Sequence, residues 1–418
     1  MTFLPNPHRI RGFPSNNPML DRDAGRAVTE LLAKIFDYEP TPLVWLPATA
    51  KSNGLASLHV KDEGARLGLK SFKALGGAYA VIRLVLQAAS RQLGRDVAVT
   101  ELPRPATGSL ALPSGAAQDQ RGDAEVARIA AGMTFACATD GNHGQSVAAG
   151  ARLVGARAVI FVHQGVSAER RQAIARFGAE MRVVSGTYDD AVAESIRQCE
   201  LNGWTLLSDT SWCGYTDVPK WVMQGYTAMV HEISWQLEAP PTHVFLQAGV
   251  GGFAAAVATS LASVYEHAPP QVVIVEPSLA ACLLASALAG HGVKVDAGKP
   301  TLMSMLECYE PSLVAWDLLK PLAAAFMTVD EEDAVAAMQV LAHPMADAEV
   351  VVAGESGGAG LAGLLAACRD PVAKAALELG PTARVLLINT EGATDEMGYE
   401  AAVGAAPARV AARVAAAS

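Results

Sequence analysis

The sequence predicts an α/β protein with mostly parallel sheets, and three observations support this fold class. From Met133 onward, short apolar strands alternate with helical segments, which is typical of a parallel sheet covered on both faces. A second series of the same kind starts at His243. Of the 418 residues, 51% are hydrophobic and only 18% are charged, so the chain can fill large buried layers.

The expected elements follow the chain in a regular order. The first series has strands at 133–139, 156–162, 181–186 and 204–209, with helices at 144–155, 168–178 and 188–203. The second series has strands at 243–247, 271–277 and 384–389, with helices at 253–265 and through Leu283. Before both series we expect a helix around Arg26 to Phe36 and another from Tyr79 to Ala88, and residues 407–418 are expected to form a frayed helix.

A chain of 418 residues exceeds one ordinary core, so we expect two domains that are interleaved in sequence. We predict a large domain from residues 1–85 and 215–418, and a small domain from residues 86–214. Residues 89–122 are rich in Pro, Gly, Ser and Arg, which favours a flexible insertion over core structure.

Composition and charge exclude several classes of partner. The net charge is −10 and no basic run is present, which argues against nucleic acid and anionic membranes. Prolines and charges occupy residues 1–30, where a signal peptide would have an apolar core. The uncharged run 240–265 is broken by glycines and fits a strand, a turn and a helix. The six cysteines form no C-x-x-C pair, so we expect no disulfide framework, no metal site and a reducing, cytoplasmic location.

The stretch from His59 to Tyr79 carries the first candidate catalytic residue, Lys73. This lysine lies in a turn between an expected strand and an expected helix, and Gly76 and Gly77 allow the backbone to approach a flat group closely. Such a turn suits an amine that loses its proton and attacks a carbonyl. The alternative is that Lys73 is one of 32 basic residues on a solvated face.

Two glycine turns precede expected helices and predict anion-binding sites. Residues 139–144 (TDGNHG) place backbone N–H groups at a helix N-terminus, in a form suited to a carboxylate. Residues 247–252 (QAGVGG) have the form that holds a phosphate, but lack both the NTPase lysine and the dinucleotide G-x-G-x-x-G spacing. The alternative for the first turn is a helix cap formed by Asp140 or Asn142.

Polar groups also follow two expected strands. Asp209 ends the strand at 204–209, and Asn389 and Thr390 follow the strand at 384–389. Carboxyl ends of parallel strands are where α/β enzymes bind ligands, so both segments are candidate site residues. A simple helix cap at Asp209 and an ordinary strand-to-loop transition at Asn389 are the alternatives.

In this order, the motifs resemble fold type II pyridoxal-phosphate (PLP) enzymes, the family of the tryptophan synthase β chain. The resemblance rests on SFKALGG, DGNHG, GVGG and NTEGATD and covers nearly the whole chain. The ATDGNHG form, the DTSW segment and the stretch GYTDVPKWVMQGY are most similar to the diaminopropionate ammonia-lyase family. The resemblance implies two three-layer domains with PLP in the cleft between them, the large domain binding PLP and the small domain lying on the substrate side.

The resemblance also implies residue roles. Lys73 is the lysine that forms a Schiff base with PLP, Asn142 lies beside the ring hydroxyl, and Thr390, or less readily Asn389, faces the pyridine nitrogen. Asp140 and Asp209 take the α-proton from substrates of opposite hand, Asp209 from the L form and Asp140 from the D form. The phosphate is held by Gly249, Val250, Gly251 and Gly252, and the substrate by Ser71, Thr139, Gly141 and His143. The chain departs from the family pattern at residues 89–122 and 304–310, where bulky side chains can line the substrate end of the pocket.

The implied activity is PLP-dependent α,β-elimination of 2,3-diaminopropionate to pyruvate and ammonia, carried out by a homodimer on a small amino acid. A serine or threonine dehydratase, or another β-eliminating enzyme of this fold, is the nearer alternative. Such enzymes need no carboxylate at both Asp140 and Asp209, so the pair of acids discriminates between the two. A non-catalytic protein that binds amino acids or the cofactor is the more distant alternative.

Overall fold

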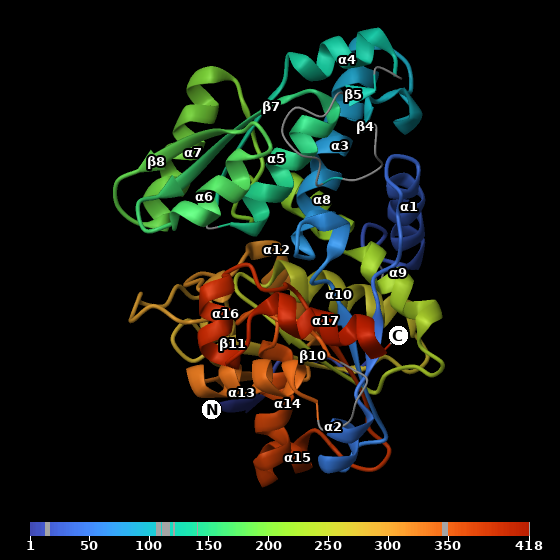
Figure 1. Ribbon diagram of the computed structural model, residues 1–418, viewed down its shortest axis with the longest axis vertical. Coiled ribbons are helices and arrows are strands. Elements are labelled where there is room, and N and C mark those ends of the chain that lie inside the picture. The colour runs from blue at the N-terminus through green and yellow to red at the C-terminus, as the bar shows by residue number, and fades with distance from the viewer. Residues whose placement is uncertain are drawn as a thin grey trace.

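The structure is a computed structural model that describes residues 1–12, 17–105, 110, 118–119, 122–139, 141–344 and 350–417 (Figure 1). The strands are β1 (Phe3–Pro5), β2 (Leu43–Trp45), β3 (Ser57–Asp62), β4 (Arg104–Pro105), β5 (Gln118–Asp119), β6 (Thr134–Ala138), β7 (Arg157–His163), β8 (Glu180–Val184), β9 (Thr205–Leu206), β10 (His243–Gln247), β11 (Gln271–Pro277), β12 (Ala325–Val329) and β13 (Arg384–Asn389). The α-helices are α1 (Arg22–Ala33), α2 (Pro47–Ser52), α3 (Lys73–Leu93), α4 (Ala124–Ala131), α5 (Asn142–Val154), α6 (Ala168–Ala175), α7 (Tyr188–Asn202), α8 (Asp217–Gly225), α9 (Thr227–Gln236), α10 (Gly252–Val264), α11 (Cys282–Ala289), α12 (Leu313–Leu322), α13 (Glu331–Ala342), α14 (Ala359–Arg369), α15 (Pro371–Ala376), α16 (Glu396–Val403) and α17 (Pro407–Ala417). Short 3-10 helices are η1 (Arg66–Gly68), η2 (Val99–Glu101) and η3 (Ser304–Leu306).

Two mainly parallel sheets organise the described part of the chain. A seven-stranded sheet has the order β1-β12-β11-β10-β13-β3-β2, in which only the edge strands β1 and β2 pair antiparallel. A four-stranded parallel sheet has the order β8-β7-β6-β9. The predicted α/β class with mostly parallel sheets is therefore confirmed. The exact domain boundaries at residues 85/86 and 214/215 stay a prediction.

Alternate residues of the central strands enter two different hydrophobic cores. On β10, Val244 and Leu246 pack on the side of α1, α9 and α10, whereas Phe245 packs on the side of α13 and α14. The first core also contains Phe135 and Cys137 of β6, so it continues into the four-stranded sheet. Figure 1 shows the unit with β7 and β8 above the unit with β10 and β11, with α8 between them. One continuous core thus joins the two sheets.

The helix that begins at Lys73 is longer than predicted. The expected span from Tyr79 to Ala88 was wrong at both ends, because α3 runs from Lys73 to Leu93. Its two early glycines do not break the helix, since neighbouring side chains pack against them. A Cβ placed on Gly76 would lie 2.5 Å from the ring of Tyr226, and a Cβ on Gly77 would lie 2.6 Å from the hydroxyl oxygen of Ser146.

The predicted flexible insertion at 89–122 is consequently wrong for residues 89–93, which are the last turns of α3. Ala89 is buried in the core, and the helix ends where Gly94 adopts a left-handed conformation (φ 64°). Short strands β4 and β5 pair further along the segment. Residues 106–109, 111–117 and 120–121 of the predicted insertion lie outside the described residues.

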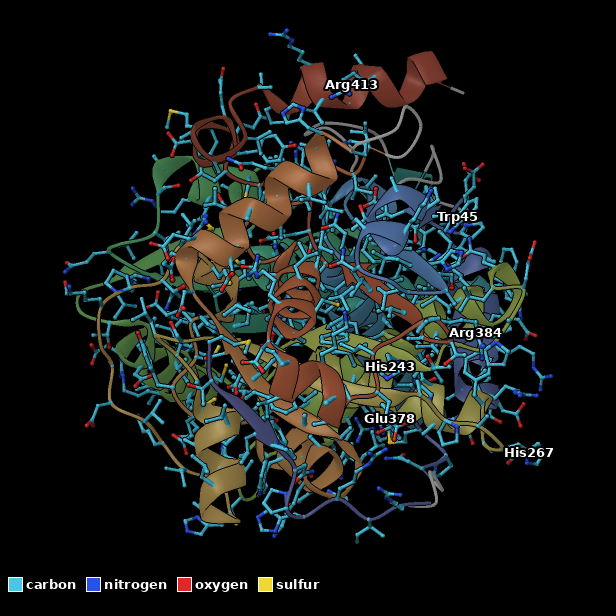
Figure 2. All side chains as sticks on the ribbon, turned by 90° about the horizontal axis from the view of Figure 1, so that it is seen from below. Trp45, His243, His267, Glu378, Arg384 and Arg413 are labelled. Atoms are coloured by element: carbon cyan, nitrogen blue, oxygen red, sulfur yellow. The ribbon has the colours of Figure 1, made fainter. Side chains whose placement is uncertain are left out.

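Both ends of the chain contain more structure than predicted. Helix α1 begins at Arg22, ahead of the expected Arg26, because the Asp21 side chain accepts a hydrogen bond from the Ala24 N–H at 2.8 Å. Strand β1 and its partner β12 were not predicted. Helix α17, which was expected to fray, packs through the buried Val410, and Arg413 donates to the carbonyl oxygen of Ala342 at 3.1 Å (Figure 2).

The uncharged run 240–265 forms β10, a glycine turn and α10, as predicted. Among the described residues, none of the helices combines the length and the apolar character that crossing a membrane requires.

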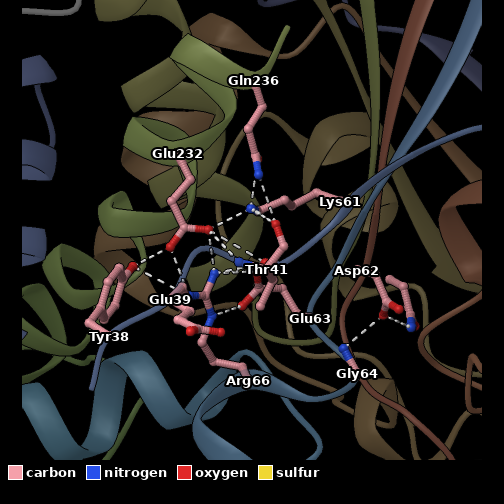
Figure 3. Close-up of polar contacts among 11 residues, drawn as sticks. Tyr38, Glu39, Thr41, Lys61, Asp62, Glu63, Gly64, Arg66, Glu232 and Gln236 are labelled. Atoms are coloured by element: carbon pink, nitrogen blue, oxygen red, sulfur yellow. Dashed lines mark hydrogen bonds and ion pairs between the residues drawn. The ribbon is translucent and has the colours of Figure 1, made fainter. Parts of the chain in front are cut away.

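Four charged side chains are buried together where the segment that precedes Lys73 packs against α9 (Figure 3). Lys61, Glu63, Arg66 and Glu232 are each exposed by 1% or less. The Glu232 carboxylate accepts hydrogen bonds from the Lys61 ammonium at 2.5 Å and from the Arg66 guanidinium at 2.7 Å and 2.8 Å. Glu63 accepts a further bond from Arg66 at 2.6 Å. Two cations and two anions therefore balance, and this cluster fixes β3 and η1 against α9.

We predict that Glu232→Gln lowers the free energy of unfolding by about 3–5 kcal/mol, because it leaves two buried cations with one carboxylate. Burial acts to raise the pKa of Glu232, but Arg66 and Lys61 outweigh it and lower the pKa. Glu232 therefore contributes stability above its unfolded pKa and loses it as the pH falls toward its folded pKa. Denaturant unfolding across the acidic range should show this loss in the parent and not in the variant.

The matched control is Glu30→Gln on the exposed face of α1, which should change the free energy of unfolding by less than about 0.5 kcal/mol. If Glu232→Gln is as stable as this control, the cluster does not hold the fold as proposed.

Candidate active site

Lys73 is the first residue of α3, and backbone contacts to the end of β13 set its position. Ser71 forms an antiparallel bridge with Glu391, and the Phe72 N–H donates to the carbonyl oxygen of Thr390 at 3.0 Å. The turn that carries Lys73 is therefore attached to the seven-stranded sheet, while α3 itself packs against α5 beside the four-stranded sheet. This arrangement places the Lys73 side chain between the two sheets.

The Lys73 ammonium forms an ion pair with the Asp209 carboxylate, which follows β9. Burial acts to lower the pKa of Lys73, but Asp209 outweighs it and raises the pKa. Burial acts to raise the pKa of Asp209, but the Lys73 ammonium outweighs it and holds the pKa below its usual range. Both groups are consequently ionised in this arrangement, and Asp209 is an acceptor in direct contact with the Lys73 ammonium.

His143 presents an acceptor beside this pair. Its Nε2 lies 2.8 Å from the carbonyl oxygen of Leu207, which can only accept, so Nε2 carries the proton. Burial lowers the pKa of His143, which favours the neutral ring. Nδ1 is then an acceptor, lies 3.9 Å from the Asp209 carboxylate, and is buried without a hydrogen-bond partner among the described residues.

The turn before α5 holds two more predicted residues in place. The Thr139 hydroxyl oxygen accepts from the N–H groups of Gly141 at 3.0 Å and Gly144 at 3.1 Å. The Asn142 amide donates to the Glu391 carboxylate at 2.7 Å, so α5 is tied to the end of β13. Asp140, the second predicted catalytic acid, lies outside the described residues.

The glycine turn between β10 and α10 is packed too closely for a side chain at its first glycine. A Cβ on Gly249 would lie 2.8 Å from the sulfur of Cys308. Gly251 caps α10 with φ 95°, a left-handed conformation that strongly favours glycine. Backbone N–H groups at a helix N-terminus attract anions, so this turn can hold a phosphate.

Thr390 and Asn389 differ in how they are engaged. The Asn389 amide donates to the Asp62 carboxylate at 2.7 Å and to the carbonyl oxygen of Val352 at 3.2 Å, and Asn389 does not line the cavity. The Thr390 hydroxyl oxygen accepts from the Gln247 amide at 3.0 Å and does line it. The geometry therefore favours Thr390 as the hydroxyl that meets a bound ligand.

Apart from Asn389, all predicted site residues that the structure describes line a single cavity at the carboxyl ends of β6, β9, β10 and β13. They are Ser71, Lys73, Thr139, Gly141, Asn142, His143, Asp209, Gly249, Val250, Gly251, Gly252 and Thr390. Residues 304–308 also line it, in agreement with the expectation that this segment borders the pocket. A larger cavity of about 870 Å³ adjoins the first and shares Tyr188, Glu307 and Cys308 with it.

Sequence reasoning assigned no role to Gln247, Ser356 and Glu391, which line the same cavity. The sequence could have indicated Gln247 as a site residue, because a polar side chain at the end of the otherwise apolar run VFLQ needs buried hydrogen-bond partners. No sequence pattern indicates Cys308 as a site residue, since only the folded chain brings its sulfur close to Gly249.

Comparisons with known proteins agree with this geometry. The sequence profile of the family described as "Pyridoxal-phosphate dependent enzyme" matches residues 104–391. The chain is 35% identical to diaminopropionate ammonia-lyase from Escherichia coli strain K12 over 393 residues, covering 93% of each chain. The crystal structure of the E. coli enzyme with D-serine superposes with a TM-score of 0.81 at 34% identity, covering 96% of each chain. A biosynthetic L-threonine dehydratase from Mycobacterium tuberculosis H37Rv is 30% identical over 58% of this chain and 54% of its own.

The cavity fits PLP on its own chemistry. It combines a lysine, a helix N-terminus at a glycine-rich turn, and a buried hydroxyl that already accepts a hydrogen bond. These groups come from distant parts of the chain and converge on one space between the two sheets. The chain therefore belongs to the fold type II PLP-dependent enzymes, in the family of the diaminopropionate ammonia-lyases.

Proposed function

We propose that this chain catalyses the PLP-dependent α,β-elimination of 2,3-diaminopropionate to pyruvate and ammonia. The observation that carries the proposal is the partly buried ion pair of Lys73 and Asp209, which lies in one cavity with the glycine turn at Gly249 to Gly252. The similarity to diaminopropionate ammonia-lyases over nearly the whole chain supports this substrate.

The residues that hold the cofactor come from both sheets. The N–H groups of Gly249, Val250, Gly251 and Gly252 would hold the phosphate, Asn142 would lie beside the ring hydroxyl, and Thr390 would face the pyridine nitrogen. When bound there and joined to the substrate amine, PLP withdraws electrons from the substrate Cα. The protein then has to orient the substrate and to move protons.

Lys73 and Asp209 divide the proton transfers. Lys73 attacks a carbonyl only after its ammonium loses a proton, and Asp209 is in position to take it. Once Lys73 is uncharged, burial acts on Asp209 without that opposing charge, so the pKa of Asp209 rises and the carboxylate becomes a stronger base. After Asp209 has released the Lys73 proton to solvent, its carboxylate can take the Cα proton of the L substrate, and we propose Asp140 for the D substrate.

His143 is proposed to contact the departing β-amino group. An amine leaves as ammonia only when it carries the proton, and a protonated amine is a hydrogen-bond donor. The buried Nδ1 of His143 is an acceptor without a partner in the described residues, and it lies beside the Asp209 carboxylate. The two acceptors together suit a cationic leaving group.

A serine or threonine dehydratase is the alternative function. The decisive experiment incubates the purified protein with L-2,3-diaminopropionate, D-2,3-diaminopropionate and L-serine, and measures pyruvate and ammonia. Elimination from diaminopropionate followed by hydrolysis yields two ammonia molecules per pyruvate, whereas elimination from serine yields one. Turnover of L-serine above both diaminopropionates would favour the dehydratase.

We also propose that the protein works as a cytoplasmic homodimer. None of the six cysteines forms a disulfide, which suits a reducing compartment. The negative net charge and the small amino-acid substrate suit a cytosolic enzyme better than one that binds nucleic acid or membranes.

Lys73→Ala should abolish the visible absorbance of lysine-bound PLP and lower activity by several orders of magnitude, because Lys73 both carries the cofactor and moves protons. Absorbance spectra and borohydride trapping followed by peptide mapping measure this. Lys70→Ala is the matched control, because the Lys70 side chain pairs with the exposed Glu396 and does not line the cavity. A trapped adduct on Lys70 in the Lys73 variant would contradict the assignment.

Gly251→Asp should abolish retention of PLP. The change adds a negative charge at the helix N-terminus that meets a phosphate dianion, and it strains a left-handed backbone position. Gly203→Asp, at a left-handed glycine with nothing near its Cβ position, adds the same charge away from the site and should retain PLP. The measurement is the PLP content after gel filtration; equal content in the two variants would place the phosphate elsewhere.

Asp140→Asn and Asp209→Asn should each depress turnover of one enantiomer of diaminopropionate, by roughly 10²–10⁴-fold for the affected hand. The Cα protons of the two enantiomers point to opposite faces when the carboxylate is held in one place. We expect Asp209→Asn to affect the L form and Asp140→Asn the D form, as measured by kcat/KM on each. Equal losses on both enantiomers in both variants would exclude two separate bases.

A further inference from the structure

Gln247, at the carboxyl end of β10, is a buried amide whose orientation is determined by its neighbours. Its Nε2 lies 2.9 Å from the carbonyl oxygen of Ile388, 3.1 Å from that of Gly357 and 3.3 Å from that of Ser356. Carbonyl oxygens only accept hydrogen bonds, so the group facing them must be the NH₂ donor. Rotating the amide by half a turn would bring its oxygen against these three carbonyl oxygens.

The other side of the amide supports the same orientation. Oε1 has no hydrogen-bond partner among the described residues and faces the start of α14, where a Cβ on Gly360 would lie 3.1 Å away. The N-terminal end of a helix carries partial positive charge, which favours a carbonyl oxygen there. Gln247 therefore acts as a donor toward everything on its Nε2 side.

Thr390 lies on that donor side. Its hydroxyl oxygen is 3.0 Å from the Gln247 Nε2 and accepts from it. A hydroxyl has one proton, and within the described residues no acceptor contacts the Thr390 hydroxyl. Because Thr390 lines the cavity, its proton remains available to a group bound there.

We propose that Gln247 is a positioning residue that keeps the Thr390 hydroxyl proton directed at the pyridine nitrogen of PLP and so keeps that nitrogen unprotonated. A nitrogen that accepts a hydrogen bond from a hydroxyl uses its lone pair and needs no proton of its own. An unprotonated ring withdraws electrons less strongly, which favours loss of the β-substituent over protonation at the cofactor carbon and transamination. The inference rests on the proposed function, because it requires PLP in this cavity.

The test uses holoenzyme loaded with PLP labelled with ¹⁵N at the pyridine nitrogen and measures its ¹⁵N chemical shift. The parent should show the shift of an unprotonated, hydrogen-bonded nitrogen. In Gln247→Met the Thr390 hydroxyl is free to donate to the carbonyl oxygens that Gln247 no longer contacts. The pyridine nitrogen then loses its hydrogen-bond donor and can take up a proton, so its ¹⁵N chemical shift should change to that of a protonated pyridinium. The isosteric Gln247→Glu should change the ¹⁵N chemical shift in the same direction, because a carboxyl oxygen facing Thr390 accepts the hydrogen bond that the hydroxyl would otherwise donate to the pyridine nitrogen.

Ser356→Ala is the matched control, because the Ser356 hydroxyl also lines the cavity and has no hydrogen-bond partner among the described residues. Ser356→Ala should leave the ¹⁵N chemical shift unchanged. A changed shift in Ser356→Ala together with an unchanged shift in Gln247→Met would mean that the Ser356 hydroxyl contacts the pyridine nitrogen, and would overturn the proposal. Pyridoxamine phosphate formed during turnover should rise in the Gln247 variants and stay at the parent level in Ser356→Ala.

Two Thr390 variants test the same contact if the Gln247 variants do not fold. Thr390→Ser keeps the hydroxyl and should keep the parent shift, whereas Thr390→Val should lose it; a parent shift in Thr390→Val overturns the inference. Failure of the parent to bind PLP at Lys73 would refute the proposed function. An unchanged ¹⁵N shift in a loaded Gln247 variant would refute only the role of Gln247.

Discussion

The contact on which the site depends is the partly buried ion pair between Lys73 and Asp209. An ammonium or a carboxylate alone in this position would carry a large desolvation cost, and each offsets that cost for the other. The pair also connects the start of α3, which is attached to the seven-stranded sheet, with the segment that follows β9 in the four-stranded sheet. The Lys73 amine is therefore held in its charged form, in contact with a carboxylate that can accept its proton.

The Lys73 turn is anchored on both sides by different kinds of contact. Upstream, the buried cluster of Lys61, Glu63, Arg66 and Glu232 ties β3 and η1 to α9 through balanced charges. Downstream, the start of α3 packs closely on its neighbours because Gly76 and Gly77 have no side chains. An error in either anchor would displace the amine from Asp209, so the glycines and the charges serve the same geometry.

Much of the fold was predictable from local patterns. The alternating series that begin at Met133 and His243 correspond to β6–β9 and to β10, β11 and β13. All of these strands except β8 and β9 are largely buried on both faces and therefore produce continuous apolar runs. The failures have identifiable causes. The glycines of α3 indicated a turn by intrinsic propensity, and packing against Tyr226 and Ser146 overrides that propensity. The three-residue strand β1 has no pattern of its own and exists only because β12 pairs with it.

The candidate site was likewise predictable from the sequence only in part. The sequence by itself determined which chemical groups are present and that they follow strands: the lysine, the glycine-rich turn at Gly249 to Gly252, and the polar residues after β9 and β13. Only the tertiary structure decided which groups meet. Lys73 and Asp209 are 136 positions apart, and Gln247 and Thr390 are 143 apart. A choice such as Thr390 over Asn389 depends on which side chain the pleat turns toward the cavity and which toward Asp62, and hydrogen bonds between distant segments have no local sequence pattern to reveal them.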